Sequence, residues 1–347
     1  MNEKLFPDAS KLSNEFANGF FATVGFIFEY PRKAASPLER TMKFELLLES
    51  PYNLARCTLV FGQFPSDGTD VWVPPREILP AQHHRLHVVE GEAVLAITEQ
   101  NENSRLTVRT HPPRPKYLST LQARVSWQFH LDAPLGEFYR RAEKHPFFRS
   151  IIKNLYGVKP HRPSSLYEMA VIAITEQQLA LPVAVKMRSR LVEALGRKMT
   201  FEGKNYRAFP TAEAVAKCKV SDLRALSFST RKAEYLIALS EKVASKSFDL
   251  EGLRDRPNEE VIAALTSLRG LGRWSAEYFL SRGLGRSEVF AADDLGIQTL
   301  VGKYLGPGRR VTAEDCQKIL KPWGNYKRWM VFYLFCASRL GLIQEKS

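Results

Sequence analysis

The sequence predicts an α+β protein in which an N-terminal antiparallel β-sheet domain, residues 1–130, precedes an all-helical domain, residues 131–347. Apolar residues before position 130 occur in short and often alternating segments that turn-forming residues separate, which is the pattern of strands. After Pro134 the apolar spacing becomes helical. At 347 residues the chain is long enough for two or three subdomains with a sizeable core.

The charge distribution changes at the same place in the chain. Residues 1–130 contain 14 Lys and Arg against 14 Asp and Glu, whereas residues 131–347 contain 36 against 23. The whole formal net charge of +13 therefore lies in the helical part. A basic surplus that is confined to one domain indicates a surface that binds a polyanion.

Within the first domain we expect several strands and a single helix near residues 53–63. Turn clusters at residues 65–68 and 100–104 separate these elements. The clearest predicted strands cover residues 22–28, 42–48, 88–98 and 123–131.

Three histidines of this domain, His83, His84 and His87, raise the question of a metal site. No cysteine lies near them in the sequence, and no second cluster of ligand residues accompanies them. We therefore expect these histidines in a surface loop or at a strand edge, and we expect no metal ion.

The composition also limits where the protein acts. Nothing at the N-terminus resembles a secretory signal, and no apolar run reaches the length of a membrane span. The cysteines are scattered, which is typical of reduced thiols inside a cell and lacks the tight spacing of an iron–sulfur site. We expect a protein of the cytoplasm or nucleoid, or of the nucleus in a eukaryote, with no membrane partner.

The helical part begins with predicted helices at residues 138–145 and 147–155, which Pro146 separates. Ser165 and Glu168 then form a capping-box pattern, which predicts the start of a further helix that runs to about residue 178.

The most informative stretch covers residues 266–299. A helix end leads into a turn with two glycines, and a second helix follows from about residue 273 to residue 282. Glycines let another backbone come close, and the first N–H groups of the new helix point outward. Free N–H groups and the positive end of a helix dipole bind phosphate, and two arginines flank this turn. The turn consists of Leu268, Arg269, Gly270, Leu271 and Gly272, and Arg273 follows it.

Aromatic and acidic residues follow this hairpin at short spacing. Trp274 and Tyr278 are four positions apart and therefore share one helix face. After a polar turn, Asp293 and Asp294 stand at the start of another predicted helix. An aspartate at a helix start is often only a cap, so the pair gains meaning from its neighbours.

The order of hairpin, aromatic pair, short spacer and aspartate resembles the helix-hairpin-helix, Gly-Pro-Asp superfamily of DNA glycosylases. Within it, the chain resembles the AlkA-like 3-methyladenine DNA glycosylases. The resemblance covers residues 131–347 well and residues 1–130 only in type. One departure is Arg269, which stands where the family commonly has proline and adds a charge beside a backbone-mediated contact.

The resemblance implies roles for individual residues. Asp294 is the expected catalytic carboxylate, and Asp293 either caps the following helix or assists its neighbour. The expected base pocket consists of Trp274, Tyr278 and Phe332, the last from an aromatic-rich helix near the C-terminus.

Two further sets of residues are expected to contact the duplex. Gln178 matches the position that fills the gap left by an extruded base, with Gln177 and Leu179 as open alternatives. The DNA backbone is expected to lie on the hairpin residues Arg269, Gly270, Leu271, Gly272 and Arg273.

The implied function is base excision DNA repair by a monofunctional DNA glycosylase. It would flip alkylated purines, of the 3-methyladenine and 7-methylguanine type, out of duplex DNA and hydrolyse the N-glycosidic bond. Lyase-active relatives use a lysine shortly after the hairpin, and residues 266–299 contain none. We therefore expect no AP lyase activity.

The implied partner is double-stranded DNA that contains damaged bases, bound by a monomer. No cofactor is required, although a monovalent cation on the hairpin carbonyls is compatible with the sequence. Two alternatives remain at this point. One is a glycosylase of the same fold for another lesion, 8-oxoguanine or a deaminated purine, and the other is a DNA-binding module without catalysis.

Overall fold

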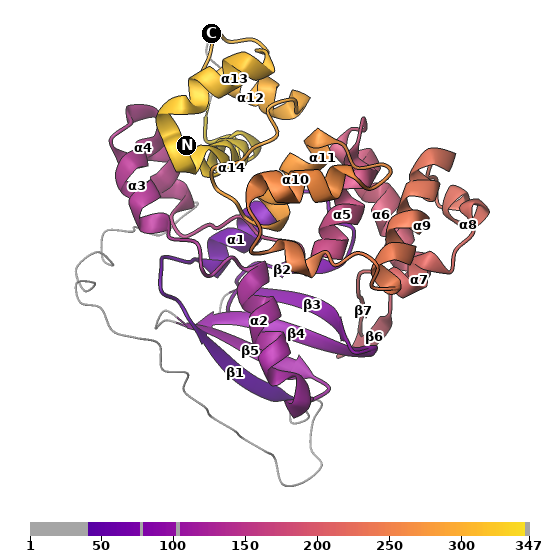
Figure 1. Cartoon of the computed structure of the whole chain (residues 1–347). Coiled ribbons are helices and arrows are strands. Elements are labelled where there is room, and N and C mark those ends of the chain that lie inside the picture. The colour runs from indigo at the N-terminus through magenta and orange to yellow at the C-terminus, as the bar shows by residue number, and fades with distance from the viewer. Residues whose placement is uncertain (1–40, 77–78, 102–104, 344–347) are drawn as a thin grey trace.

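The computed structural model describes residues 41–76, 79–101 and 105–343, and it confirms an α+β organisation in which a sheet precedes most of the helices (Figure 1). The predicted strand at residues 22–28 lies outside the described residues. In Figure 1 the sheet lies at the bottom, and the helices of the second part lie above it.

Five antiparallel strands form this sheet, in the order β1-β5-β4-β3-β2. β1 confirms the strand predicted at residues 42–48. The prediction of one strand over residues 88–98 is wrong, because Glu90 and Gly91, with φ of 49° and 78°, form a two-residue turn between β3 and β4. The strands are β1 (Met42–Leu47), β2 (Asp70–Val73), β3 (Gln82–Val89), β4 (Glu92–Asn101) and β5 (Arg105–His111).

Two helices belong to this first part. α1 (Leu54–Phe61) confirms the helix predicted near residues 53–63, and the side chain of Asn53 caps it. The strand predicted at residues 123–131 is wrong, because α2 (Leu118–Gln128) occupies most of this segment. Apolar and polar residues alternate there, but the buried positions of α2 follow helical spacing; they are Leu121, Val125 and Gln128.

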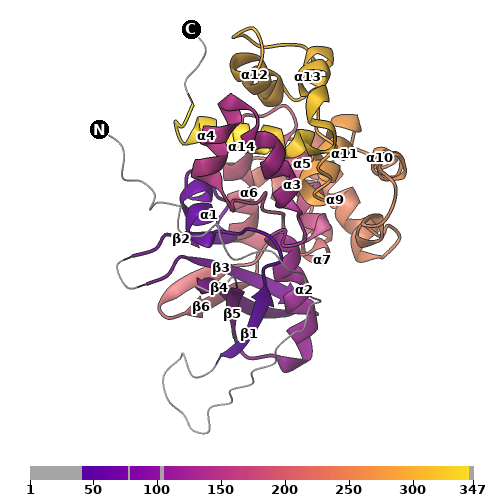
Figure 2. The same ribbon diagram turned by 90° about the vertical axis from the view of Figure 1, so that its left-hand side faces the viewer.

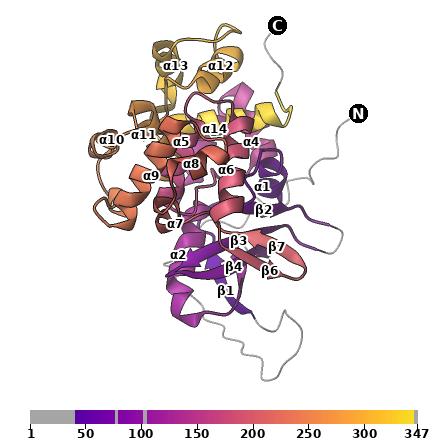
Figure 3. The same ribbon diagram turned by 90° about the vertical axis from the view of Figure 1, so that its right-hand side faces the viewer.

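The sheet is covered on both faces (Figures 2 and 3). α2 packs on one face, and a small hairpin of β6 (Lys198–Phe201) and β7 (Lys204–Arg207) packs on the other. Phe201 and Tyr206 of this hairpin contact the apolar residues that β3 and β4 present there. The second part is therefore not all-helical as predicted, because a segment of it returns to bury an apolar sheet face.

The helices of the second part confirm the predicted breaks. Pro146 begins α4, where a missing N–H costs nothing. The Ser165 side chain accepts the N–H of Glu168 at the start of α5, while the Glu168 carboxylate accepts the N–H of Ser164, so the capping box is only half formed. The helices are α3 (Leu135–Glu143), α4 (Pro146–Leu155), α5 (Leu166–Glu176), α6 (Leu181–Leu195), α7 (Ala212–Ala216), α8 (Val220–Ala225), α9 (Thr230–Ala244), α10 (Asn258–Thr266), α11 (Arg273–Tyr278), α12 (Leu295–Tyr304), α13 (Ala313–Leu320) and α14 (Lys327–Arg339).

Two hydrophobic cores hold these elements together. One core joins the sheet to α1–α4 and to α12–α14. The other core joins α5–α11. The core around the sheet therefore continues across residues 130 and 131, where the sequence predicted a domain boundary, because helices from both ends of the second part pack against it.

A buried ion pair connects the sheet to the second core. The Arg85 guanidinium, on β3, donates to Oε2 of Glu168 on α5 at 2.5 Å and to Oδ2 of Asp70 at 2.6 Å. Arg85 is 2% exposed, so the loss of either carboxylate would leave the buried guanidinium with only one of its two partners.

In the described part of the chain, no helix combines the length and the apolar character that a membrane span requires. The four cysteines carry free thiols, as the sequence predicted; they are Cys57, Cys218, Cys316 and Cys336.

Candidate active site

The predicted hairpin forms between α10 and α11. α11 begins at Arg273, and a π-helical segment, Phe279–Gly283, continues it. The hairpin packs against α5, and Figure 1 places it below α12. No side chain caps the start of α11, so its first N–H groups remain available to an external acceptor. This arrangement suits an oxyanion such as phosphate.

The two glycines of the turn have different roles. Gly270 has φ of +96°, and a Cβ there would lie 2.3 Å from Cγ of Tyr235. Gly270 is therefore required by the fold itself. Gly272 meets nothing within 4 Å of an added Cβ, so the space beside it is open to a ligand.

The remaining hairpin residues divide between core and surface. Leu271 is buried at 5% exposure and anchors the turn in the second core. Arg269 is exposed and pairs with Glu234 at 3.0 Å. Arg273 is exposed and pairs with Glu277 at 2.9 Å. Both arginines are exposed at the surface beside the open side of the turn. Exposed ion pairs contribute little free energy, so each arginine can leave its glutamate for another anion at low cost.

The end of α5 reaches this hairpin through Gln177. Its side-chain amide donates to the carbonyl of Gly270 at 2.7 Å and to Oγ of Ser275 at 2.8 Å. The ammonium of Lys232 donates to the carbonyls of Thr175 and Gln177, at 2.6 and 2.8 Å. These bonds hold the end of α5 from two sides.

Gln178 follows directly and is exposed, with φ of +54°. A non-glycine residue in this left-handed region is uncommon and is held there by its surroundings. Because the side chain of Gln177 is engaged with the hairpin, Gln178 and the 38% exposed Leu179 are the residues that project freely. The alternative Gln177 therefore fits a wedge poorly.

Asp294 stands at the start of α12 and faces the hairpin helix. Its Oδ1 accepts the backbone N–H of Ile297 at 2.9 Å, and its Oδ2 accepts Nε1 of Trp274 at 3.2 Å. The carboxylate is only partly exposed. The structure thus brings the predicted catalytic residue and one predicted pocket residue into direct contact.

Asp293 does not cap α12. The N-cap is Asp294, and Asp293 lies one residue earlier in an exposed turn. The alternative that Asp293 caps this helix is therefore wrong, because the turn before α12 ends one residue later, whereas its other predicted role, assisting Asp294, stays a prediction. The carbonyls of Ala291 and Ala292 accept the N–H of Asp294 and the Gln298 amide, and these bonds fix the loop.

Tyr278 lies beside Trp274, with ring centroids 5.2 Å apart and planes inclined by 31°. Its hydroxyl donates to Oε2 of Glu176 at 2.8 Å and accepts from Arg282 at 2.5 Å. Burial raises the pKa of Tyr278 to about 12, so the phenol stays neutral. Arg188 donates to the other oxygen of Glu176 at 2.9 Å. Tyr278 is therefore held in one orientation by a charged network.

Phe332 lies on α14 and is 8% exposed. Its ring contacts in the described residues are with Phe61 of α1, at 6.3 Å between centroids, and with Tyr333. The structure places no ring contact between Phe332 and the pair Trp274 and Tyr278. Arg328 lies one turn earlier on the same helix, and burial lowers the pKa of its guanidinium.

The three histidines of β3 are not at the surface. His83, His84 and His87 are 1–4% exposed, and β3 is an interior strand, so the prediction of a loop or strand edge is wrong. β3 buries both of its faces although it contains three histidines and an arginine, and this polar composition led the sequence prediction to a loop or an edge.

One of these histidines belongs to a group that has metal-ligand residue types. The ligand atoms of Asp70, His83 and His161 lie within 4.8 Å of one another. However, Oδ1 of Asp70 already accepts from His83 and from the Gln128 amide, both at 2.8 Å. Arg85 binds the other oxygen of Asp70, and its positive charge opposes a cation. The group therefore fits a buried hydrogen-bond network better than a metal centre.

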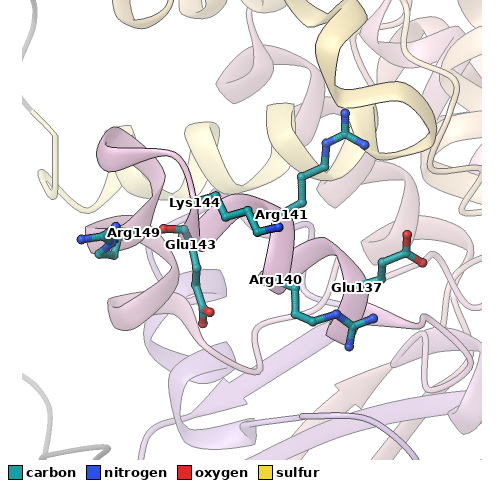
Figure 4. Close-up of a pocket in the computed structure, with 6 residues that line it drawn as sticks. All are labelled: Glu137, Arg140, Arg141, Glu143, Lys144 and Arg149. Carbon is teal, nitrogen blue, oxygen red and sulfur yellow. Dashed lines mark hydrogen bonds between the residues drawn. The ribbon is translucent and has the colours of Figure 1, made fainter.

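A shallow pocket on α3 and α4 lies on another side of the molecule (Figures 1 and 4). Four basic and two acidic side chains line it, and all are exposed. In Figure 4, Arg141 points toward the C-terminal helices, where it donates to the carbonyl of Pro322. The lining residues are Glu137, Arg140, Arg141, Glu143, Lys144 and Arg149.

In a comparison with known proteins, one family model matches both the hairpin and the aspartate. Residues 171–325 match the family described as HhH-GPD superfamily base excision DNA repair protein. This part of the chain is similar to that superfamily. The matched residues contain the end of α5, the hairpin, Asp294 and the start of the aromatic-rich segment, and Phe332 lies beyond them.

Individual relatives agree with this family. A DNA-3-methyladenine glycosylase of Bacillus subtilis is 28% identical over 207 residues, which are 60% of this chain and 68% of the relative. The structure of a 3-methyladenine DNA glycosylase from Archaeoglobus fulgidus superposes with a TM-score of 0.74 at 28% identity, covering 87% of this chain and 100% of that one. A Schizosaccharomyces pombe 3-methyladenine DNA glycosylase in complex with abasic DNA has a TM-score of 0.51 at 25% identity, covering 60% of this chain and 99% of that one.

Sequence reasoning missed most of the residues that support this site from a distance. Lys232 and Glu176 come from helices far from the hairpin in the sequence, and Gln177, which the sequence offered only as an alternative wedge, holds the hairpin instead. No local pattern marks them, since each acts through a tertiary contact. Only the repeated glutamine at the end of α5 gave a signal, and it pointed to the neighbouring residue.

Proposed function

We propose that this chain is a monofunctional DNA glycosylase that releases alkylated purines from damaged double-stranded DNA. The names of the Bacillus subtilis and Archaeoglobus fulgidus relatives support 3-methyladenine as a substrate. The observation that carries the proposal is the contact between Asp294 and Trp274 beside the open turn of the hairpin. It combines a carboxylate, an aromatic ring and a phosphate-binding turn in one place.

The hairpin would hold the DNA backbone. The free N–H groups at the start of α11 and the exposed Arg269 and Arg273 would contact phosphates on the strand that carries the lesion. Gln178, and Leu179 beside it, would enter the duplex where the damaged nucleotide leaves the stack. Extrusion of a nucleotide costs a few kcal/mol, which these contacts would offset.

The aromatic residues would receive the extruded base. An alkylated purine such as 7-methylguanine carries a positive charge, and a cation over an aromatic face gains about 0.5–2 kcal/mol. Trp274 and Tyr278 would offer such faces, and Phe332 would close the pocket from α14. Tyr278 keeps its orientation because its hydroxyl is fixed between Glu176 and Arg282.

Asp294 would stabilise the reaction at the sugar. Departure of the base with the bonding pair leaves positive charge on C1′ and the ring oxygen, and a nearby carboxylate lowers the energy of that state. The cationic purine leaves as a neutral molecule, and water then adds to C1′ and releases its proton to the solvent. Trp274 and the N–H of Ile297 hold the carboxylate in a fixed orientation, so little reorganisation is needed when charge develops.

The proposal also covers strand cleavage, cations, cofactors and the oligomeric state. No lysine lies in residues 266–299, so we expect hydrolysis without strand cleavage. A monovalent cation would bind the hairpin carbonyls; Gly270 already accepts the Gln177 amide, and a carbonyl oxygen keeps a second lone pair. Such a cation would add positive charge next to the phosphate. We expect a monomer to carry out the reaction without a cofactor.

The test is direct detection of released bases. The purified chain is incubated with DNA that has been methylated chemically, and the free bases are separated and identified. We expect 3-methyladenine and 7-methylguanine in solution and alkali-labile abasic sites in the DNA, with no strand breaks before alkali treatment. Release of no modified base would reject the proposal, and strand breaks without alkali would reject its monofunctional part.

A further inference from the structure

The loop between α1 and β2, in the sheet part of the chain, is joined to α6 by an ion pair that lies away from solvent. Nε of Arg188, on α6, donates to Oδ2 of Asp67 at 3.3 Å. The other oxygen of Asp67 accepts the N–H and the hydroxyl of Thr69, at 3.2 and 2.7 Å, so the loop itself fixes this carboxylate. Arg188 is 3% exposed, and water therefore screens the pair little.

The same arginine continues to the end of α5. Its other donor nitrogen binds Oε1 of Glu176, the last residue of α5, at 2.9 Å, whereas the guanidinium of Arg282 lies 3.7 Å from that oxygen. The second oxygen of Glu176 accepts the hydroxyl of Tyr278 at 2.8 Å. Arg188 is therefore the nearer of the two arginines that face the carboxylate to which Tyr278 is bound.

The contacts continue from Tyr278 to the proposed catalytic carboxylate. The ring of Tyr278 lies 5.2 Å from that of Trp274 between centroids, and the Trp274 indole donates to Asp294 at 3.2 Å. An unbroken series of contacts thus connects Asp67, in the sheet part, with Asp294 at the start of α12.

We propose that Asp67 and Arg188 are positioning residues for base release, which hold Glu176, and through it Tyr278, in the orientation that receives the extruded base. This inference rests on the proposed glycosylase function and gives the sheet part of the chain a role in its chemical step. Both residues act through Tyr278, so neither needs to touch the DNA.

The charges around Glu176 explain why Arg188 matters for the tyrosine. Without Arg188, the carboxylate would turn toward Arg282, the remaining arginine that faces it. Arg282 also donates to the hydroxyl of Tyr278, at 2.5 Å. The two partners of this hydroxyl would then bind each other, and Tyr278 would lose the bonds that fix its ring.

The first test measures base release and DNA binding separately. Asp67→Asn is the mild variant, because its amide oxygen can keep the bonds to Thr69 while its NH2 group faces Arg188, which is also a donor. Arg188→Met removes the cation. We expect both variants to release 7-methylguanine from a duplex roughly 5- to 30-fold more slowly in single turnover with enzyme in excess. Affinity for an undamaged duplex should not change, because the hairpin is proposed to hold such DNA.

The second test asks whether the two residues act through the tyrosine hydroxyl. In a chain that carries Tyr278→Phe, adding Asp67→Asn should change the rate by less than about twofold, because the group that is positioned is already absent. Arg188→Lys keeps a cation beside Glu176 and should restore part of the rate that Arg188→Met loses. A merely structural role would give the same fold loss with and without the hydroxyl.

The third test follows Tyr278 without DNA. In the full chain with isotope-labelled tyrosine rings, the NMR signal that is missing from Tyr278→Phe belongs to Tyr278. This signal should shift in Asp67→Asn and in Arg188→Met. Lys186→Met is the matched control, because Lys186 is exposed on α6 and its loss removes one positive charge from the same helix. In this control the signal and the rate of release should stay as in wild type.

Three results would overturn the inference while the wild-type chain still releases 7-methylguanine. They are a wild-type rate in Asp67→Asn and Arg188→Met, an equal fold loss with and without the tyrosine hydroxyl, and a Tyr278 signal that does not move in either variant. Release of no modified base by the wild-type chain would instead reject the proposed function, and the inference with it.

Discussion

The indole Nε1 of Trp274 lies 3.2 Å from Oδ2 of Asp294 and donates a hydrogen bond to it. The other carboxylate oxygen accepts the N–H of Ile297 at 2.9 Å and caps α12. One side chain therefore serves the fold through Oδ1 and faces the aromatic pocket through Oδ2. Substitutions of Asp294 must be chosen so that these two roles are separated.

Asp294→Asn is the substitution that separates them. Asparagine caps helices about as well as aspartate, so α12 should keep its start. The amide oxygen would take the cap, and the NH2 group would then face the indole N–H, which is also a donor. We expect base release to slow by about 100- to 1,000-fold, which is about 2.7–4 kcal/mol of lost transition-state stabilisation. Single-turnover excision measures this loss.

Asp293→Asn is the matched control, because Asp293 is exposed and caps nothing. It should retain most of the activity, and both variants should keep the wild-type melting temperature. Wild-type rates in a folded Asp294→Asn variant would show that the site is assigned wrongly. Loss of activity in Asp293→Asn alone would move the catalytic carboxylate by one residue.

The sequence was sufficient for the hairpin, the aspartate and most helices, because each has a local signal in turn residues, caps or apolar spacing. It was misleading in α2, where apolar and polar residues alternate as in a strand and apolar residues also recur at helical spacing. This segment folds as a helix over the sheet. It also could not anticipate that β6 and β7 return to cover the other sheet face. Such choices depend on which apolar surface needs cover, and that surface exists only after other elements have packed.

The candidate site likewise contains residues that the sequence indicated and supporting residues that it did not. Asp294, Trp274 and Tyr278 are close in sequence and could be grouped from their spacing. The bonds from Gln177 and Lys232 that hold the end of α5 join residues more than 50 positions apart. Sequence spacing contains no information about contacts of this kind, so the supporting residues were found only in the structure.

The two hairpin glycines should respond differently to substitution. Gly272→Ala places a methyl group in open space, so the fold should be unchanged while phosphate is kept from the backbone N–H groups. We expect weaker binding to undamaged and damaged duplexes alike, measured by fluorescence anisotropy over a range of salt concentrations. Gly270→Ala is the contrast, because its Cβ meets Tyr235 and its φ is +96°, so the melting temperature should fall.

Wild-type affinity itself should fall steeply as salt rises, since contacts with phosphate release counterions. Salt-independent binding, or a Gly272→Ala variant that binds as tightly as wild type, would remove the hairpin from the DNA interface.

Gln178 should act after binding, at the step that extrudes the nucleotide. Gln178→Gly keeps the left-handed backbone, at φ of +54° in the wild type, and removes the side chain that would fill the gap. We expect slower base release with nearly unchanged binding to undamaged DNA. A fluorescent adenine analogue next to the lesion would report the extent of unstacking.

Gln177→Ala provides the comparison, because it breaks the bonds to Gly270 and Ser275 and should disturb the hairpin itself. That variant should weaken binding to all duplexes. If Gln178→Gly unstacks DNA as well as wild type does, Leu179 becomes the better candidate for the wedge.

The buried histidines should make the fold sensitive to acid. Burial lowers the pKa of His84 and of His161 to about 4, whereas an unfolded chain has the ordinary value near 6.5. Between these values the unfolded state binds protons that the folded state does not. The free energy of unfolding is therefore highest above about pH 6.5 and falls as the pH drops toward 4, by about 2 kcal/mol per histidine at pH 5.

Urea denaturation at pH 7.5, 6 and 5 measures this dependence. In His84→Gln the fall should be smaller, because one titrating group is gone while an amide can still bond to Tyr206 or Gln82. A free energy of unfolding that stays constant from pH 7.5 to 5 would contradict the buried, neutral state of these side chains.

The last prediction concerns Lys232, which bonds to the carbonyl of Gln177, the residue before the proposed wedge. Burial lowers the pKa of Lys232 to about 8, so part of its amine would be neutral in mildly alkaline buffer, as imine formation with a sugar aldehyde requires. However, its nitrogen donates to the carbonyls of Thr175 and Gln177, which direct it toward the end of α5. We therefore expect borohydride to trap no covalent adduct between the protein and DNA at pH 8. Lys232→Arg keeps donors for both carbonyls and should excise bases at a rate close to wild type, whereas Lys232→Met should be slower because the end of α5 loses its support. An adduct that forms with wild type and disappears in Lys232→Arg would identify Lys232 as a nucleophile and overturn the monofunctional assignment.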